Sequence, residues 1–237
     1  MPLSWFDAAR QWTNENSGFL TLLLFIVTII AGWSSGIFKA LRNRPSFNIQ
    51  ALPGPTFACT FPTGRKHEGH DTHRTAFCLY LSVTNRGNSP TDLLSVELGY
   101  HNYTPRYSFL WLWLQHETVA LDDFQVPIGD HVKVYPFLNQ VNRLSRSMPD
   151  TYLGPGRKVI GVVYFEQPVA WGGWLPRVTD QHTRVKVRIT DAHEKRHTKL
   201  VTIPFVSLED ARRYNPLFGA TLEALHNARR TVGEGGA

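Results

Sequence analysis

The chain contains 237 residues, of which 42% are hydrophobic, 12% aromatic and 19% charged, and its formal net charge is +6. This composition excludes a disordered chain, because aromatic and β-branched residues are too abundant. The two cysteines, Cys59 and Cys78, are too few for a disulfide-dense mini-protein. A mean hydropathy of −0.23 excludes a multi-pass channel but is compatible with a single membrane span.

The first predicted element is an uncharged apolar segment. No charged residue occurs from Asn16 to Phe38, and about 20 apolar residues suffice to cross a hydrocarbon core of roughly 30 Å. We therefore predict a leader over residues 1–17 and a transmembrane helix over residues 18–41. The leader is compatible either with a short amphipathic helix on the membrane surface or with a frayed end.

A cleavable signal peptide is the main alternative to a retained anchor. Such a peptide has a basic start and an apolar core of about 7–15 residues. Here one arginine and two acids precede a longer apolar run, so we expect an uncleaved anchor. Basic residues flank spans on the cytoplasmic side, and Lys39, Arg42 and Arg44 follow this span directly. We predict an inner-membrane protein with its N-terminus outside and its large domain in the cytoplasm.

Two glycines toward the end of the span, Gly32 and Gly36, form a G-x-x-x-G pattern. This spacing lets two helices approach closely and favours a homodimer, although glycine is also common in spans that do not pair. The same five residues match G-x-S-x-G, the nucleophile elbow of hydrolases, which requires a sharp turn after a strand. No strand precedes the pattern here, so we reject the hydrolase interpretation.

Residues 45–206 are predicted to form a β-domain, because apolar and polar residues alternate with a period of two and turn residues recur. In Thr75–Asn85 we expect the odd-numbered residues from Phe77 to Val83 to face the core. The other predicted strands are Ser46–Leu52, Leu93–Tyr100, Val119–Phe124, His131–Pro136, Lys158–Glu166, Thr183–Thr190 and His197–Ile203. The last two are expected to form a hairpin. Seven or more short strands with regular turns are typical of a β-sandwich.

The segment Leu79–Leu98 contains a strand, an Asn-Arg-Gly turn and a second strand. It resembles bacterial immunoglobulin-like domains, which carry such strand–turn–strand units, and the turn Leu153–Gly156 before an apolar strand is similar to them too. The resemblance covers two hairpins and implies a mainly β, immunoglobulin-like β-sandwich that binds or scaffolds. Many such domains lie outside the cell, which conflicts with the cytoplasmic location predicted from the basic flank.

Residues 207–237 are predicted to form a tail of short helices. Two acids follow Ser207 within one turn, as at a capped helix start, so we expect a helix over Ser207–Tyr214. A second, basic helix is expected over Thr221–Arg230.

The segment His193–His197 matches H-E-x-x-H, the signature of zinc hydrolases. That chemistry requires a helix, which places both histidines on one face with Glu194 beside the metal-bound water. The segment instead lies between two alternating strands, so we predict a hairpin loop.

Three histidines and two cysteines stand in or beside the polar segment Gly64–Arg74: His67, His70, His73, Cys59 and Cys78. Imidazoles and thiolates suit zinc or copper, but the spacing matches no metal motif, so a solvated loop is the preferred interpretation. We predict no metal and no cofactor. In the cytoplasm both thiols should be reduced, and a disulfide between them would contradict the predicted orientation.

A dense aromatic run, Tyr107–Leu114, is too short to span a membrane. Either it packs in the core, or it forms an exposed patch that faces the membrane or a partner. In the second case Phe109, Trp111 and Trp113 are the candidate contact residues.

Residues 39–237 carry 24 Lys and Arg against 17 Asp and Glu, a formal net charge of +7. Anionic lipid attracts such charge beside a span. We expect no nucleic-acid partner, because no recognition motif is present and the basic residues form no evident stripe. The prediction is a non-catalytic binding or scaffolding protein with an unidentified protein partner. One alternative is a membrane-perturbing effector whose sandwich senses a signal. The other is a metal-dependent enzyme that uses either His193, Glu194 and His197 or the His67–His73 loop.

Overall fold

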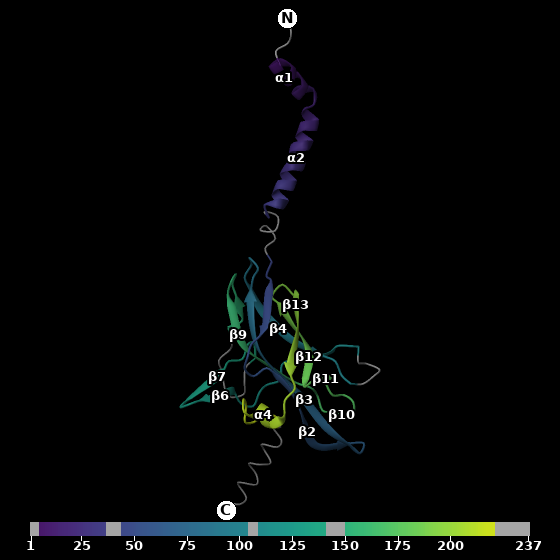
Figure 1. Cartoon of the computed structure of the whole chain (residues 1–237), viewed down its shortest axis with the longest axis vertical. Coiled ribbons are helices and arrows are strands. Elements are labelled where there is room, and N and C mark those ends of the chain that lie inside the picture. The colour runs from purple at the N-terminus through teal and green to yellow at the C-terminus, as the bar shows by residue number, and fades with distance from the viewer. Residues whose placement is uncertain (1–4, 37–43, 104–108, 141–149, 221–237) are drawn as a thin grey trace, which may run out of the picture. The chain divides into compact units, whose positions relative to one another are not determined.

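Two units make up the chain, Met1–Arg44 and Pro45–Ala237, and each is described by itself. The structure is a computed structural model that describes residues 5–36, 44–103, 109–140 and 150–220 (Figure 1). The molecule is mainly β, with one apolar helix near the N-terminus.

The N-terminal unit contains α1 (Trp5–Glu15) and α2 (Ser17–Ser34). Helix α2 has a mean hydropathy of 2.0 and is long and apolar enough to cross a membrane, a test that a signal sequence also passes. Its two threonine hydroxyls, Thr21 and Thr28, donate to carbonyls one turn earlier at 2.8 and 2.7 Å. Inside a bilayer, where no water is available, such internal bonding satisfies the polar groups.

Helix α2 ends earlier than the predicted span of residues 18–41. Its last residue is Ser34, and Gly36 adopts a φ of 75° while its N–H donates to the Trp33 carbonyl at 3.2 Å. A positive φ is the usual conformation of a glycine that terminates a helix. Residues 37–41 lie outside the described residues. Eighteen residues rise about 27 Å, slightly less than the hydrocarbon thickness.

The first sheet is organised around the long strand β3 (His70–Asn85). Strands β1 (Phe47–Ala51) and β2 (Phe57–His67) pair along one edge of β3, and β9 (Lys158–Glu166) and β10 (Ala170–Trp171) pair along the other. All four pairings are antiparallel.

The second sheet is organised around β4 (Thr91–Tyr100) and β12 (His182–Asp191), which are antiparallel neighbours. Four more strands complete it: β5 (Leu112–Leu114), β8 (Tyr152–Leu153), β11 (Val178–Thr179) and β13 (Arg196–Pro204). Strands β12 and β13 form the expected hairpin.

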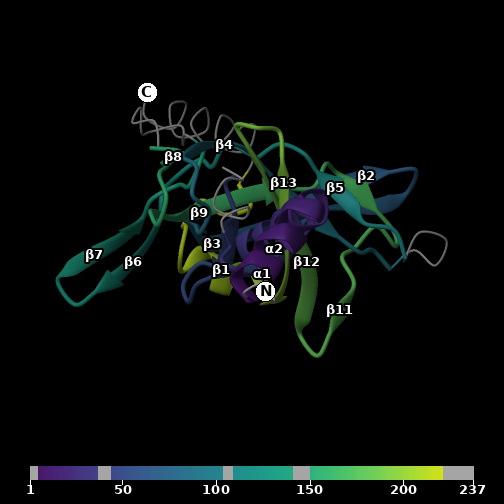
Figure 2. The same ribbon diagram turned by 90° about the horizontal axis from the view of Figure 1, so that it is seen from above.

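A separate hairpin, β6 (Phe124–Ile128) and β7 (His131–Tyr135), extends away from both sheets (Figure 2). Strand β13 leads to the short helix α4 (Leu208–Arg212), whose N-cap Ser207 accepts a hydrogen bond from the Asp210 N–H at 3.1 Å. The predicted helix start is therefore confirmed. The second predicted helix, Thr221–Arg230, lies outside the described residues.

Side chains from both sheets form one buried cluster, the shared core. The odd-numbered residues from Phe77 to Val83 of β3 belong to it, which confirms the predicted core face. From the second sheet, alternate residues of β4 and β12, such as Leu98 and Val187, meet them.

The opposite face of β3 is also buried, which the alternation did not predict. Ala76 and Cys78 belong to a second cluster that includes Phe124 and Tyr135 from the β6–β7 hairpin. Phe218, beyond α4, completes this cover. Part of the first sheet therefore packs on both faces.

Two sequence predictions about strands are wrong. The segment Gly64–Arg74 is the tip of the β2–β3 hairpin and not a loop, and β2 itself was missed. The predicted strand Val119–Phe124 is irregular up to residue 123, and β6 begins at Phe124.

Candidate functional site

Strand β12 presents a row of basic side chains on the outer face of the second sheet. His182, Arg184, Lys186 and Arg188 alternate there with residues of the shared core. They share one face because successive side chains of a strand point in opposite directions. This row corrects the expectation that the basic residues form no stripe. The sequence already indicated this row, because basic and apolar residues alternate within Thr183–Thr190.

Two tryptophans of the aromatic run cover part of this row. The guanidinium carbon of Arg188 lies 3.5 Å from the centre of the Trp113 ring. The Nη1 atom of Arg188 also donates a hydrogen bond to Glu97 Oε2 at 2.8 Å. Lys186 Nζ lies 4.2 Å from the centre of the Trp111 ring. Aromatic faces attract cations at such distances. Arg188 and Lys186 therefore already have partners within the protein for their positive charges.

Gly99 allows Trp113 to lie flat on the sheet. The β4–β5 register pairs the two residues, and a Cβ on Gly99 would stand 3.2 Å from the indole ring. Leu112 and Leu114 pack against the shared core on the other face. Both interpretations of the aromatic run therefore apply in part. Leu112 and Leu114 face the core, whereas Trp111 and Trp113 face outward and are half-buried.

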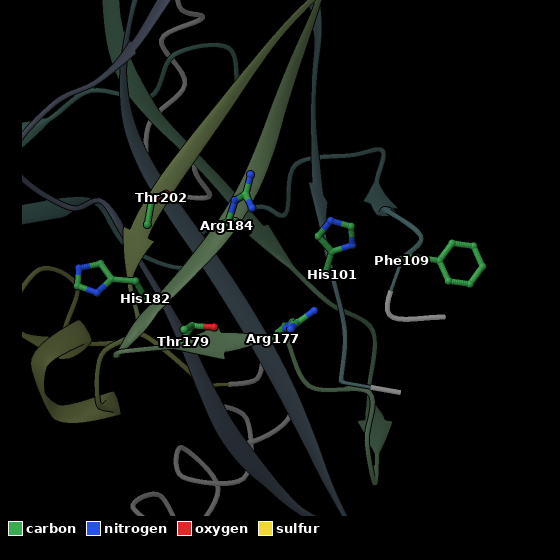
Figure 3. Close-up of a pocket in the computed structure, with 7 residues that line it drawn as sticks. All are labelled: His101, Phe109, Arg177, Thr179, His182, Arg184 and Thr202. Atoms are coloured by element: carbon green, nitrogen blue, oxygen red, sulfur yellow. The ribbon is translucent and has the colours of Figure 1, made fainter. Parts of the chain in front are cut away.

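An open pocket of about 570 Å³ lies on the same face. Its lining residues are His101, Phe109, Arg177, Thr179, His182, Arg184 and Thr202 (Figure 3). None of these lining residues is acidic. Within the part of the chain that the structure describes, the guanidinium groups of Arg177 and Arg184 have no hydrogen-bond or ion-pair partner, and both residues are exposed.

A tight turn between β11 and β12 fixes one wall of the pocket. Asp180 and Gln181 have φ values of 49° and 57°. A two-residue hairpin turn of type I′ requires a positive φ at both of its central positions. The turn places Thr179 opposite His182, whose Nδ1 donates to the Asp180 carbonyl at 2.7 Å. Non-glycine residues held at positive φ are a mark of constrained sites.

The end of β4 fixes the opposite wall. The Arg177 N–H donates to the His101 carbonyl at 2.7 Å, and the Tyr103 hydroxyl donates to the Val178 carbonyl at 2.6 Å. These bonds join the end of β4 to the β11–β12 hairpin, two segments that lie far apart in the sequence. Figure 3 shows Arg184 between Thr202 and His101, with His182 and Phe109 at opposite ends.

The H-E-x-x-H segment lies on the turn between β12 and β13, as predicted. His197 Nε2 donates to Asp191 Oδ2 at 2.8 Å, and Asp191 Oδ1 accepts from the N–H groups of His193 and Lys195 at 2.9 and 3.0 Å. Burial alone would raise the pKa of the Asp191 carboxyl, but these donors outweigh it and hold the pKa below its ordinary value. His197 therefore has a structural role in a buried pair.

The three histidines of the β2–β3 hairpin do not converge. His67 and His70 pair across the turn, and the ring of His67 stacks on Trp171 with centroids 4.2 Å apart. Burial lowers the pKa of His73. In the described ranges, no group of three or more histidine, cysteine and acidic side chains is placed to hold a metal ion.

Both cysteines are buried and free on the second-cluster face of the first sheet. Burial raises the pKa of Cys59 to about 11 and that of Cys78 well above its ordinary value. Because thiolates and not thiols react with alkylating reagents, iodoacetamide at pH 8 is expected to label neither cysteine in the folded chain. Both should be labelled after unfolding, as mass spectrometry would show, and fast labelling of the native chain would contradict this packing.

The residues predicted to act at the membrane are only partly described. Gly32 lies within α2, whereas Gly36 lies beyond its end, so the two glycines do not share a continuous helix. Lys39 and Arg42 lie outside the described residues, and Arg44 is exposed. Pairing of spans through the glycines stays a prediction.

Comparisons with known proteins assign no family. No family model matches the chain, and no curated protein matches it. The similar solved structures include a Bordetella pertussis protein described as ApaA, with 6% identity and a TM-score of 0.28, covering 69% of this chain and 96% of that one. A structural-genomics target, SoR45, shows 4% identity and a TM-score of 0.26, covering 68% and 85%. Both scores are too low to establish a shared fold.

The aromatic run in the sequence indicated Phe109, Trp111 and Trp113, but no sequence pattern indicated the pocket beside them. Phe109 is 72% exposed and lines one end of it. The basic residues of the pocket come from the residue after β4, from the residue before β11 and from β12, and no local motif links them.

Proposed function

We propose that this chain is a single-pass membrane protein whose β-rich unit is a non-catalytic binding domain for an anionic ligand. The observation that carries the proposal is the pair of exposed guanidinium groups, Arg177 and Arg184, beside an open pocket without acidic lining. Arginine presents a fixed fork of donors that matches carboxylate and phosphate groups. Unpaired arginines at a preformed pocket therefore favour recognition of an anion.

The proposed fold of the binding domain is an immunoglobulin-like β-sandwich. Support comes from antiparallel pairing in both sheets and from the shared core, to which both contribute. In sandwiches the inner faces of two sheets pack together and leave outer faces for solvent and ligands. The row on β12 would then occupy such an outer face.

A binding role is supported by the positions of the catalytic candidates. His197 is hydrogen-bonded to buried Asp191, and Glu194 lies on a turn with a φ of 59°. Neither arrangement resembles the helical geometry that a zinc hydrolase of this signature requires.

The proposed location is the inner membrane, with α2 as the anchor and the domain in the cytoplasm. The support is the apolar α2 followed by Lys39, Arg42 and Arg44. Anionic lipid is expected to interact with this basic flank.

A pair of reporter fusions to the C-terminus tests this topology. In a bacterial host, a fluorescent protein that matures only in the cytoplasm is expected to be bright and to sediment with the membranes. A phosphatase that is active only in the periplasm should be inactive at the same position. Replacing Lys39, Arg42 and Arg44 by glutamine should weaken this preference, because the basic flank sets the orientation. An active phosphatase fusion to the wild-type chain, or release of the chain into the soluble fraction, would contradict the proposal.

A further inference from the structure

We infer that the pocket between Arg177 and Arg184 binds a small soluble molecule that carries a phosphate group next to a ring. This inference rests on the proposed binding function and specifies the class of ligand.

The charges on the outer face fall into two groups. Arg188 is paired with Glu97 and stacked on Trp113, and Lys186 lies over Trp111. Arg177 and Arg184 have neither an acidic partner nor a stacked ring among the described residues. The positive charges of Arg188 and Lys186 are therefore balanced by neighbouring groups of the protein. Those of Arg177 and Arg184, at the pocket, are not. Two arginines can supply several charge-assisted hydrogen bonds to one phosphate.

The remaining lining adds donors and an apolar surface. Thr179 and Thr202 contribute hydroxyls, which bind phosphate oxygens without adding charge. The Phe109 ring, 72% exposed, lies at the end of the pocket opposite His182 (Figure 3). An exposed aromatic ring beside a polar pocket offers a stacking surface for a ring of the ligand. A volume of about 570 Å³ lies within the range of small-molecule sites.

Within the β-rich unit, the pocket and the point where the chain enters the unit lie at different ends of β12. The chain enters the β-rich unit at β1, where the Phe47 N–H donates to His197 Nδ1 at 3.5 Å, and His197 pairs with Ile189 of β12. Arg184 precedes Ile189 by five residues on that strand, which places the two residues about 17 Å apart.

The pocket walls are fixed without a ligand. The turn at Asp180 and Gln181 and the hydrogen bond from the Arg177 N–H to the His101 carbonyl fix the backbone that carries Arg177 and Arg184. Preorganisation of this kind lowers the entropic cost of binding.

Calorimetry of the full chain in detergent tests the inference, with pyrophosphate, ADP and adenosine as probes. Pyrophosphate and ADP are expected to bind, and ADP more tightly because its ring contacts Phe109; adenosine should not bind. Arg184→Gln and Arg177→Gln should each weaken ADP binding about tenfold or more. Lys199→Gln removes the same charge from exposed β13, outside the pocket, and should leave the affinity unchanged.

Two results would overturn the inference. One is the absence of binding by pyrophosphate and ADP at millimolar concentration. The other is an equal loss of affinity in Lys199→Gln, which would indicate unspecific charge attraction. Reconstitution into nanodiscs separates the ligand sources, because phosphatidic acid should not displace ADP from the wild-type chain. Displacement would assign the pocket to a lipid headgroup and contradict a soluble ligand. The reporter fusions remain independent, since a cytoplasmic anchored domain without ADP binding would contradict this inference alone.

Discussion

Replacement of Gly161 by alanine is expected to destabilise the β-rich unit by about 3 kcal/mol, at the upper end for an overpacked core. Gly161 lies within β9, where the segment that follows β7 crosses it. A Cβ on Gly161 would stand 2.4 Å from both Cα and N of Leu138. Those atoms belong to the backbone and are held by hydrogen bonds between Leu138 and Val162 and between Val162 and Pro136, at 2.9 and 2.7 Å. The crossing segment therefore cannot move aside without breaking its pairing.

Thermal unfolding of the full chain in detergent, followed by tryptophan fluorescence, measures this effect. A loss of about 3 kcal/mol corresponds to a fall in Tm of about 6–12 °C for a domain of this size. Gly154→Ala is the matched control, because its Cβ would stand 3.4 Å from the flexible Arg157 side chain and 3.8 Å from the Tyr152 ring, both ordinary contacts. The control should shift Tm by no more than about 2 °C. Equal Tm values for Gly161→Ala and the wild type would show that the crossing is looser than described.

Replacement of Asp191 by alanine is expected to cost about 3 kcal/mol of unfolding free energy, because it leaves buried donors without an acceptor. Asp191 is fully buried and accepts from His197 and from the N–H groups of His193 and Lys195. The same thermal assay measures the loss. Asp71→Ala is the control, since its 4.0 Å ion pair with Lys66 is exposed on both sides and should contribute little.

The cost of losing Asp191 should depend on pH in a defined direction. Hydrogen bonding holds the folded-state pKa of Asp191 below its ordinary value. The carboxylate therefore stabilises the fold fully above the unfolded-state pKa of about 3.9, and this contribution is lost as the pH falls through the lower folded-state pKa. The Tm difference between wild type and Asp191→Ala should be smaller below about pH 4 than at pH 5. A difference that grows on acidification would contradict the role given to the carboxylate.

Local patterns were sufficient to predict the strands that alternate strictly. Lys158–Glu166 matches β9, and the β12–β13 hairpin was expected because valine and isoleucine alternate there with lysine and arginine. Strand β2 was missed because Pro62, Gly64 and a run of charged residues interrupt its pattern. Its outer half is exposed, so pairing with β3 and not burial maintains it as a strand.

The second buried cluster could not be predicted for a different reason. Alternation identifies a polar and an apolar face only when one face meets solvent. On β3, Cys78 and Ala76 are small, and the hairpin and Phe218 that cover them lie far away in the sequence. Such long-range packing leaves little signal within the strand itself.

The candidate site was partly predictable from the residues. The aromatic run indicated Trp111 and Trp113, and the basic alternation on β12 was present in the sequence. The pocket itself depends on the β11–β12 turn and on the end of β4, which bring Arg177 and His101 beside Arg184. The Asp180-Gln181 turn lacks the glycine that normally marks this turn type, so the local sequence gave no signal.

Labelling of a single cysteine placed in the pocket tests the central claim most directly. Thr179→Cys puts a thiol on an exposed residue of the pocket lining, whereas Cys59 and Cys78 are buried. A membrane-impermeant maleimide is expected to label this variant in inside-out membrane vesicles but not in intact cells, and ADP should slow the labelling at least severalfold. Labelling in intact cells, or labelling in the vesicles at a rate that ADP does not change, would contradict an anchored cytoplasmic domain with a phosphate-binding pocket.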